Sequence, residues 1–292
     1  MKLSVILPCF NGANTIAVQL EALVNQQWSE PWEVIVSNNG STDNSMAIVE
    51  QYRDRLPNLR IVDAHNPSRP RRGVAHSYKV GIQAARGEAF VFCEADDEVG
   101  PGWLAAMGEA LKKYDFVAGA IDHTKLNDAW LIGNGAHIQA TGLVPNPKPP
   151  YKPYAFGCNV GMKRSVYEAV GEFDESCLTA WDMDYCSRVQ LAGTEIHFEP
   201  NAVIQYRLRH KFSDLYCQGR NWGESTMLML NKYGEPMPSF KLLKHLVRAF
   251  WQGLQHLLSF LPYRRSKADF AQWVWGCGWH LGILQGSVKY LL

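Results

Sequence analysis

The sequence lacks an excess of charge of either sign, a paired-cysteine pattern and a long uninterrupted apolar run. Its 292 residues include 29 Lys and Arg against 28 Asp and Glu, so the formal net charge is +1. No overall electric field therefore favours nucleic acid as a partner. The seven cysteines are scattered and form no CxxC pair, which argues against a zinc module or a disulfide framework and favours buried thiols in a reducing cytosol.

Other absences narrow the fold and the class of protein. No GxGxxG sequence follows the first apolar run, which argues against a dinucleotide-binding dehydrogenase. That run is broken by Pro8 and by the turn pair at 11–12, so it predicts a first strand and not a secretory signal. Internal repeats and low-complexity tracts are also missing, while 47% hydrophobic residues are typical of a folded globular protein.

Strand and helix patterns alternate through the first 120 residues. Short β-branched runs predict strands, and apolar residues at helical spacing predict helices. The predicted strands are 3–7, 33–36, 59–62, 89–93 and 115–120, and the predicted helices are 15–26, 45–55, 74–85 and 103–113. Alternation with short connections is typical of βαβ units and predicts a Rossmann-like α/β domain with a mostly parallel central sheet.

The pattern becomes less regular after residue 120. Residues 121–155 are rich in Asn, Gly and Pro and predict a connecting loop region. Helices at 163–170 and 182–191 and strands at 195–198 and 202–206 are predicted to follow. A change of character near residue 240 divides the chain into 1–238 and a C-terminal helical segment, 239–292.

Polar clusters follow the first, second and fourth predicted strands directly. In a parallel sheet these strand ends share one edge, where ligands bind near a switch in strand order. Glu94, Asp96 and Asp97 stand at the fourth strand end, and the mutual repulsion of three close carboxylates is commonly offset by a bound cation. Hard divalent ions such as Mg²⁺ or Mn²⁺ take oxygen ligands. The alternative is a solvated acidic turn that caps the next helix, and these residues alone leave both open.

The second strand ends in the turn Asn-Asn-Gly-Ser-Thr-Asp at 38–43. Glycine lets the backbone approach a base or ribose, and an Asn amide can both donate to and accept from a base edge. Taken by itself, the turn is better explained as an Asx turn that caps the following helix.

The order of the motifs resembles the family-2 glycosyltransferases of GT-A fold. The chain reads SVILPCFN at 4–11, VIVSNNGSTD at 34–43, AARGE at 84–88 and FCEADD at 92–97. It continues with FGCN at 156–159, GEFDE at 171–175 and WDMDY at 181–185. The resemblance covers roughly residues 3–210, and its strength lies in the order of four or five motifs that are individually weak.

The resemblance implies an inverting, divalent-cation-dependent transfer of a sugar from a nucleotide-sugar to an acceptor by a catalytic domain at 1–238, in cell-surface polysaccharide or glycolipid synthesis. Asp96 and Asp97 would hold the cation, Mn²⁺ or Mg²⁺. Asp182 would be the catalytic base, because inverting transfer needs a carboxylate to take the proton of the attacking hydroxyl; otherwise it would cap the helix that follows. The residues that the resemblance implies for nucleotide-sugar binding are Pro8, Phe10, Asn11, Asn39, Glu94, Asp96, Gly157 and Asn159.

Three departures from the family pattern affect the site. Asn38 and Asn39 replace an acidic pair, so no carboxylate is available there for a uracil-type base, which leaves the donor nucleotide open. Glu94 replaces an Asp, and Trp181 replaces a Glu, where an indole would either stack on a sugar or pack in the core. Two alternatives therefore stay open: a catalytically degenerate nucleotide-binding scaffold subunit, and a nucleotidyltransferase, although residues 8–13 carry no Lys or Arg for phosphate.

The C-terminal segment predicts amphipathic helices. Apolar residues share one face over 240–261 while basic residues lie mostly elsewhere, a pattern of helices that lie in a membrane interface or pack on a protein core. Residues 270–292 are rich in Trp but diluted by Gly and Gln, which favours an interfacial or re-entrant segment over a spanning one. We expect a cytoplasmic protein with peripheral contact to the inner face of the cell membrane through 240–292, a nucleotide-sugar donor, a glycan or lipid-linked acceptor, and no nucleic acid.

Overall fold

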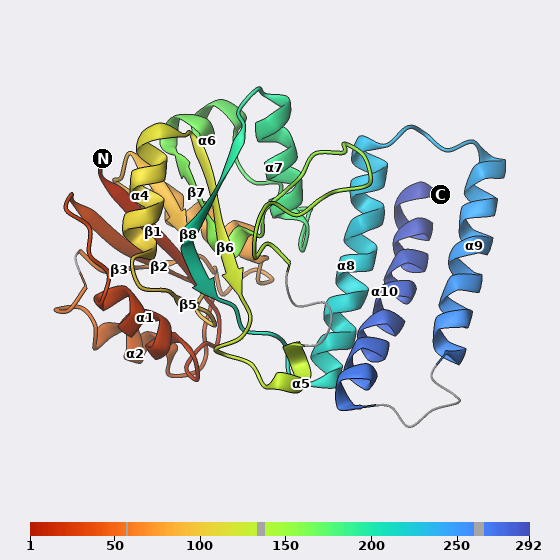
Figure 1. Ribbon diagram of the computed structural model, residues 1–292, viewed down its shortest axis with the longest axis horizontal. Helices are drawn as coiled ribbons and strands as arrows, with labels where there is room; N and C mark the ends of the chain where they lie inside the picture. The colour runs from red at the N-terminus through yellow and green to blue at the C-terminus, as the bar shows by residue number, and fades with distance from the viewer. Residues whose placement is uncertain (57, 133–137, 260–265) are drawn as a thin grey trace. The chain divides into compact units, whose positions relative to one another are not determined.

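The computed structural model describes residues 1–56, 58–132, 138–259 and 266–292, and their contacts divide the chain into two compact units (Figure 1). The described part of the first unit is 1–56, 58–126, 138–145 and 153–207, and that of the second is 127–132, 146–152, 208–259 and 266–292. The helical unit thus takes in residues from 208 onward, whereas the sequence pattern predicts a division after 238. The extent of the catalytic domain stays a prediction.

An eight-stranded sheet forms the centre of the first unit, in the order β3-β2-β1-β4-β7-β6-β8-β5. β1, β2, β3 and β4 run parallel to one another, as do β6 and β8, while β7 is antiparallel to β4 and β6 and β5 is antiparallel to β8. This arrangement confirms the predicted α/β class with a mostly parallel sheet. The strands are β1 (Leu3–Cys9), β2 (Trp32–Asn38), β3 (Arg60–Asp63), β4 (Ala89–Phe92), β5 (Glu98–Val99), β6 (Phe116–Asp122), β7 (Val160–Lys163) and β8 (Ile196–Gln205).

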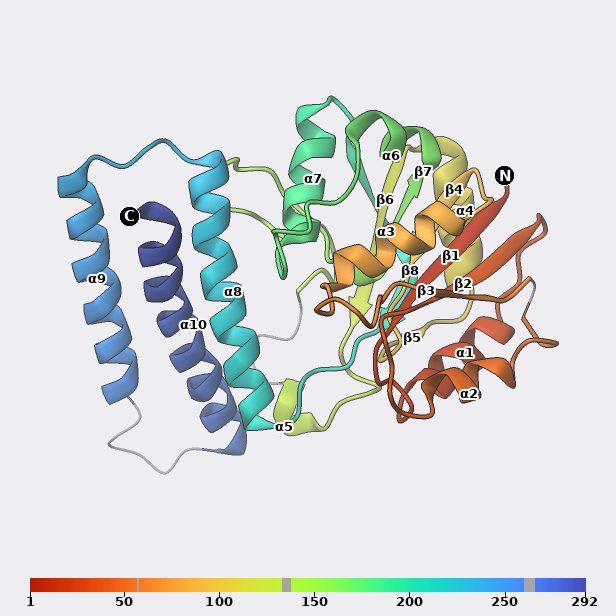
Figure 2. The ribbon, with the colours of Figure 1, turned by 180° about the vertical axis from the view of Figure 1, so that it is seen from behind.

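Helices cover both faces of this sheet, which explains why nearly every residue of its central strands is buried. In β1, Leu3, Val5 and Leu7 join the core cluster that α1 and α4 complete. Ile6 points to the opposite face, where it meets Gly81 of α3; Figures 1 and 2 show α4 and α3 on opposite faces. The helices of this unit are α1 (Ile16–Val24), α2 (Ser45–Glu50), α3 (Val74–Ala84), α4 (Trp103–Lys113), α6 (Arg164–Val170) and α7 (Trp181–Leu191), with a 3₁₀ turn η1 (Gly157–Asn159).

The strand order brings the three polar clusters together. β2, β1 and β4 are adjacent, so the loops that follow them share the carboxyl edge of the sheet. The chain passes outward from β1 to β2 and β3 and then returns to place β4 on the other side of β1. This is the switch in strand order at which α/β sheets bind ligands.

The second unit consists of α5 (Ala129–Ile132), α8 (Phe212–Tyr233), α9 (Ser239–Leu258) and α10 (Lys267–Leu291). Figure 1 shows α10 between α8 and α9, and Met227, Ala249 and Ile283 from these three helices form their shared core. In the described residues, none of the helices has the length and apolar character that crossing a membrane requires. The predicted helix 240–261 ends at Leu258, and its last two residues lie outside the described part.

Glycines let α8 and α10 approach each other backbone to backbone. A Cβ atom on Gly282 would lie 2.0 Å from the carbonyl oxygen of Arg220, and one on Gly223 would lie 2.3 Å from that of Trp279. Both distances are far inside van der Waals contact, so no larger residue fits unless the helices separate. The glycines that dilute the apolar character of this segment in the sequence therefore serve helix packing.

Gly282→Ala should destabilise the protein by about 1–3 kcal/mol, because the added methyl group overpacks this contact even though Ala is the better helix former. Gly253→Ala in α9 is the matched control, since its Cβ would lie 3.4 Å from His280, an ordinary contact. The control should be neutral or slightly stabilising in urea unfolding followed by circular dichroism. Equal midpoints for the two variants would contradict the close approach of α8 and α10.

Candidate active site

Three carboxylates meet in the turn that follows β4. One oxygen from each of Glu94, Asp96 and Asp97 lies within 4.8 Å of the others. Asp97 is buried, while Glu94 and Asp96 keep partial exposure. Carboxylates this close repel one another in a partly desolvated site, and a bound cation relieves that repulsion. The oxygen-only set at one accessible edge fits a hard divalent ion such as Mn²⁺ or Mg²⁺.

Arg207, two residues beyond the end of β8, holds this acidic turn in place. Its backbone N–H donates to Asp97 Oδ1 at 2.9 Å, and its guanidinium Nε donates to the carbonyl oxygen of Asp96 at 2.8 Å. The sequence pattern gives Arg207 no role, because the pairing of this segment with the turn depends on the folded sheet. The guanidinium thus places a fixed positive charge against the backbone of the acidic turn.

The negative charge of the acidic cluster affects the pKa of a buried residue near it. Burial is the main cause that raises the pKa of the Cys158 thiol well above its usual value, and the charges of Asp97 and Glu94 add to it. The charge of Asp182 also contributes at Cys158. The acidic cluster and Asp182 therefore lie near the same buried side chain, on one region of the first unit.

The loops after β1 and β2 are joined by hydrogen bonds. Asn11 Oδ1 accepts the backbone N–H of Thr42 at 2.8 Å, and the Asn11 N–H donates to the Ser41 hydroxyl at 3.1 Å. Asp43 Oδ2 accepts the N–H of Ala13 at 3.0 Å. Ser41, Thr42 and Asp43 thus shape the site edge. The motif at 34–43 contains them, but the sequence assigns them no individual role.

Phe10 and Asn39 lie where these loops begin. The Phe10 ring is 41% exposed, and the Arg71 guanidinium lies 3.6 Å from its centroid. Asn39 is only 4% exposed; its N–H donates to the Cys9 carbonyl at 2.8 Å and its Nδ2 to the Arg72 carbonyl at 2.9 Å. The structure thus brings two predicted nucleoside residues to one corner. Pro8 is buried within β1 and offers no surface there.

Asp182 stands in the first turn of α7, apart from the acidic cluster. Its Oδ2 accepts the N–H of Gly157 at 3.0 Å, and its Oδ1 accepts the N–H of Met183 at 2.8 Å. Burial raises the pKa of this carboxyl to about 6, and the two backbone hydrogen bonds only partly oppose that effect. The N-cap of α7 is Ala180, so Asp182 is not the helix cap that the sequence also allowed.

Trp181 packs in the core, which settles one of the alternatives left by the sequence. Its ring lies 5.0 Å from that of Tyr78 and 4.8 Å from that of Phe173, and the side chain is buried. A Cβ atom on Gly157 would lie 2.1 Å from the indole, so only glycine fits beneath it. Gly157 therefore orients Asp182 through its N–H while the Trp181 ring covers its Cα.

Asn159 does not occupy the place expected of it. The resemblance implies that Asn159 takes part in nucleotide-sugar binding, but the residue is fully buried. Its Nδ2 donates to the carbonyls of Ala120 and Ala202, and its Oδ1 accepts from the Trp103 indole at 2.8 Å. The expectation fails because the amide lies between β6 and β8, whose pairing the sequence does not reveal, and links both strands to α4.

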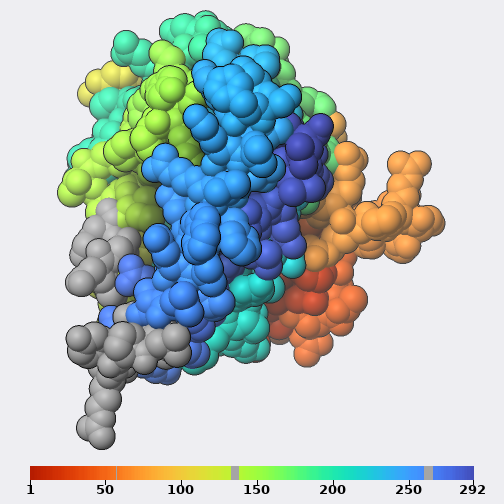
Figure 3. Space-filling view, turned by 90° about the vertical axis from the view of Figure 1, so that its right-hand side faces the viewer, coloured from red at the N-terminus to blue at the C-terminus, as the bar shows by residue number. Residues whose placement is uncertain are grey.

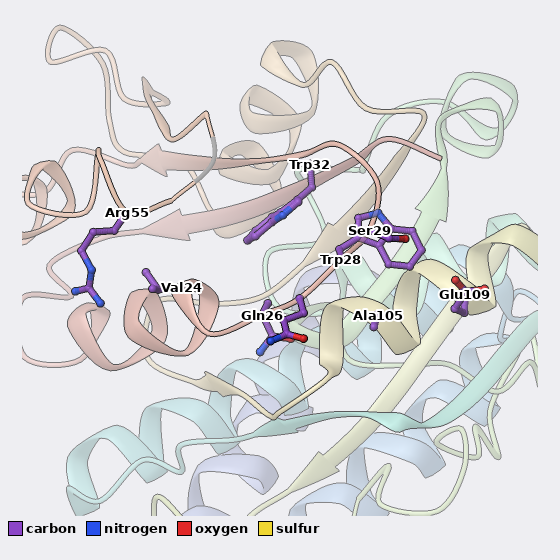
Figure 4. Close-up of a pocket in the computed structure, with 9 residues that line it drawn as sticks. Val24, Gln26, Trp28, Ser29, Trp32, Arg55, Ala105 and Glu109 are labelled. Atoms are coloured by element: carbon purple, nitrogen blue, oxygen red, sulfur yellow. The ribbon is translucent and has the colours of Figure 1, made fainter.

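A hollow near the start of β2 and a second group of possible metal ligands could be mistaken for the active site, but neither is suited to bind the nucleotide-sugar or its cation. A hollow of about 560 Å³, drawn in Figure 4, lies at the start of β2 near Trp28 and Trp32. It is at the opposite end of β2 from Asn39, and the Trp28 ring is already packed against Gly108 and under the Lys112 ammonium. A second ligand-like group, Asp174, Cys177 and Asp184, contains a carboxylate already paired with Arg188 at 2.9 Å.

Comparison with known proteins places the chain in a family. Residues 4–171 match the model of glycosyl transferase family 2. Over 100 residues the chain is 37% identical to the uncharacterized glycosyltransferase YibD of Escherichia coli. The aligned segment covers 34% of this chain and 27% of that protein. Over 104 residues it is 34% identical to the poly(ribitol-phosphate) beta-N-acetylglucosaminyltransferase TarS of Staphylococcus aureus. Here the aligned segment covers 34% of this chain and 17% of that protein. The matched segments therefore span well under half of these relatives.

Solved structures agree in fold. The mannosyltransferase PcManGT from Pyrobaculum calidifontis, in complex with GDP-Man and Mn²⁺, is 18% identical with a TM-score of 0.64 over 99% of this chain and 86% of that chain. S. aureus TarS 1-349 in complex with UDP-GlcNAc is 19% identical with a TM-score of 0.56 over 78% of this chain and 65% of that chain. The likeness confirms the GT-A fold, and because the family model covers more than half of the sequence, the chain belongs to glycosyl transferase family 2.

Proposed function

We propose that the protein transfers a sugar from a nucleotide-sugar to an acceptor hydroxyl, with inversion at the anomeric carbon and with a divalent cation. The proposal rests on the presence of two different carboxylate environments. One is the three-carboxylate cluster at the sheet edge, and the other is the separate, partly exposed Asp182, whose pKa is raised. Nucleotide-sugars in PcManGT and TarS, and the Mn²⁺ in PcManGT, support it by analogy.

The residues divide the work of the reaction. Asp96 and Asp97 would hold the cation, which supplies positive charge to offset the charge that develops on the leaving diphosphate. Glu94 belongs to the same cluster, and the Arg207 guanidinium adds a fixed charge at the backbone of this turn. Phe10, Asn11 and Asn39 would hold the nucleoside at the neighbouring corner of the edge.

Asp182 is suited to the base role. The acceptor oxygen forms a bond to the anomeric carbon as the bond from that carbon to the diphosphate oxygen breaks, and the hydroxyl proton passes to Asp182. A carboxyl with a pKa of about 6 is mainly ionised at neutral pH, yet it is more basic than an exposed aspartate. The N–H groups of Gly157 and Met183 fix its orientation.

Turnover should fall about tenfold for each pH unit below pH 6 and level off above it, because only the ionised form of Asp182 accepts a proton and its pKa is about 6. Asp182→Asn should lower kcat by roughly 10²–10⁴-fold with nucleotide affinity retained. Initial rates between pH 5 and pH 8.5 test both points. A flat profile together with an active Asp182→Asn variant would assign the base elsewhere.

Hydrolysis of a panel of nucleotide-sugars, with and without Mn²⁺ or Mg²⁺, tests donor use and cation dependence. One donor should be consumed only with the cation, and Asp97→Asn should reduce the rate by more than about a hundredfold, since cation stabilisation is worth several kcal/mol. Asp115→Asn is the control, because Asp115 is an exposed carboxylate whose partner is Lys163. Nucleotide binding with no turnover on any donor, even with candidate glycan acceptors added, would favour the scaffold alternative.

We further propose that the acceptor is a glycan or lipid-linked glycan, made at the cytoplasmic face of the cell membrane, and that α9 provides the membrane contact. α9 packs on α10 through one side, where Leu242 and Ala249 are buried and His245 hydrogen-bonds Ser287 at 2.9 Å. The α9 apolar stripe points elsewhere and consists of side chains that are 49–64% exposed: Phe240, Leu243, Val247, Phe250, Trp251, Leu257 and Leu258.

The charges of α9 favour a lipid surface as the partner of this stripe. Lys241, Lys244 and Arg248 are exposed beside it, and the helix contains no acidic residue. Figure 3 views the second unit from the side on which α9 lies in front. Basic side chains next to an apolar stripe match an anionic headgroup layer above acyl chains.

The full chain should float with phosphatidylglycerol vesicles and much less with phosphatidylcholine vesicles. Lys244→Gln with Arg248→Gln should weaken binding roughly thirtyfold, at about 1 kcal/mol per basic residue. Leu243→Glu with Phe250→Glu should abolish binding while leaving circular dichroism unchanged. If the variant Leu243→Glu with Phe250→Glu floats as well as the wild type, the membrane is rejected as the partner of the stripe. A wild-type dimer in gel filtration that this variant dissociates would show that the stripe binds a second copy of the chain instead.

A further inference from the structure

The segment 153–157 runs beside α7 and carries the N–H group that Asp182 accepts. Side chains from three successive turns of α7 bond to every second residue of this segment. The three hydrogen bonds join Asp182 to Gly157 at 3.0 Å, Cys186 to Ala155 at 3.8 Å and Gln190 to Pro153 at 2.7 Å. The placement of the N–H group at Asp182 therefore depends on how the whole segment is held.

Gln139 bonds the same segment to the central sheet. Its Oε1 accepts the N–H of Phe156 at 2.7 Å, and its Nε2 donates to the carbonyl oxygen of Gly119 at 2.8 Å. The backbone carbonyl of Gln139 also accepts the N–H of Ile121 at 3.1 Å. Gly119 and Ile121 both belong to β6. A single side chain thus connects β6 to the residue that precedes Gly157.

The backbone at Gln139 is strained, and its side chain is enclosed. Its φ is +60°, a left-handed conformation that residues other than glycine adopt only where their surroundings impose it. The residue is 4% exposed, and both polar atoms of its amide are hydrogen-bonded. An N–H donor faces the amide oxygen and a carbonyl faces the nitrogen, so the orientation of the amide is fixed. Strain of this kind collects at functional sites.

We propose that Gln139 is a positioning residue for the base: by fixing the N–H of Phe156 relative to β6, it aims the next N–H, that of Gly157, at Asp182 Oδ2. The inference rests on the proposed function and adds the residue that sets how basic Asp182 is. A hydrogen bond to the ionised carboxylate favours that form. Loss of the Gly157 N–H would therefore raise the pKa of Asp182 further.

Other titratable groups near Asp182 stay neutral over the pH range of a rate measurement. The charge of Asp182 acts on the hydroxyl of Tyr154 and on the thiols of Cys158 and Cys186. Burial raises the pKa of all three groups, that of Cys186 to about 12. An inflection between pH 5 and pH 8.5 is therefore assigned to Asp182 and not to these neighbours.

The test is the pH dependence of kcat in Gln139→Met, which is close to Gln in size but makes neither hydrogen bond. The inflection should move upward by about one pH unit, because a hydrogen bond to a charged group is worth roughly that much. On the plateau kcat should fall roughly ten- to a hundredfold, since the base is misplaced, while KM for the donor stays unchanged. Carboxyl-carbon nuclear magnetic resonance of Asp182 measures the same pKa without turnover.

Two further variants separate positioning of the base from general loss of stability. Gln26→Met is the matched control, because Gln26 is also buried, with Oε1 on the Leu104 N–H and Nε2 on the Gly100 carbonyl, both at 3.0 Å. It should lower the urea midpoint as Gln139→Met does, yet keep the inflection near pH 6. Gln139→Glu should also keep it, because burial favours a neutral carboxyl that still accepts from Phe156.

The possible outcomes distinguish the inference from the proposed function. An inflection that stays near pH 6 in Gln139→Met, or that moves equally in Gln26→Met, would overturn the role of Gln139. Wild-type protein that shows no inflection near pH 6, either in its rates or in the resonance titration of Asp182, would overturn the proposed base role itself.

Discussion

The active edge of the protein depends on one constraint: three adjacent parallel strands end at the same level of the sheet. β2, β1 and β4 are neighbours, so their loops must meet, and the acidic turn after β4 is then fastened by the backbone N–H of Arg207 to Asp97. Both elements are needed, because the strand order brings the carboxylates to the edge and Arg207 fixes their turn there. The nucleoside corner and the cation site each follow from this geometry.

Two kinds of carboxylate environment then coexist within one unit. Glu94, Asp96 and Asp97 are close enough to share a cation, whereas Asp182 accepts the backbone N–H groups of Gly157 and Met183 and has its pKa raised by burial to about 6. The difference lies in the neighbours and not in the side-chain chemistry. Gly157 makes the second environment possible, since it offers an N–H to Asp182 and space for the Trp181 ring.

Local patterns in the sequence predicted much of this arrangement. Strands β1 to β4 and helices α1, α3 and α4 follow from apolar periodicity, and the acidic and asparagine turns follow from their places at strand ends. The sequence did not reveal β5 and β7, which are short and exist through pairing with distant strands. For the same reason it did not reveal the burial of Asn159 or the attachment of Arg207. The sequence did not predict helix α8, because its glycines and polar residues obscure a helical pattern. The reason for the glycines, close packing against the backbone of α10, is visible only in the folded structure.

The central claim is that the carboxylates at this edge hold a divalent cation together with a nucleotide diphosphate. Electron paramagnetic resonance of Mn²⁺, titrated with protein in the presence of UDP and then of GDP, measures this directly. The account predicts that one of the two nucleotides strongly increases Mn²⁺ binding and that the bound ion is lost in the Asp97→Asn variant. Mn²⁺ that stays free in solution with both nucleotides would contradict the account.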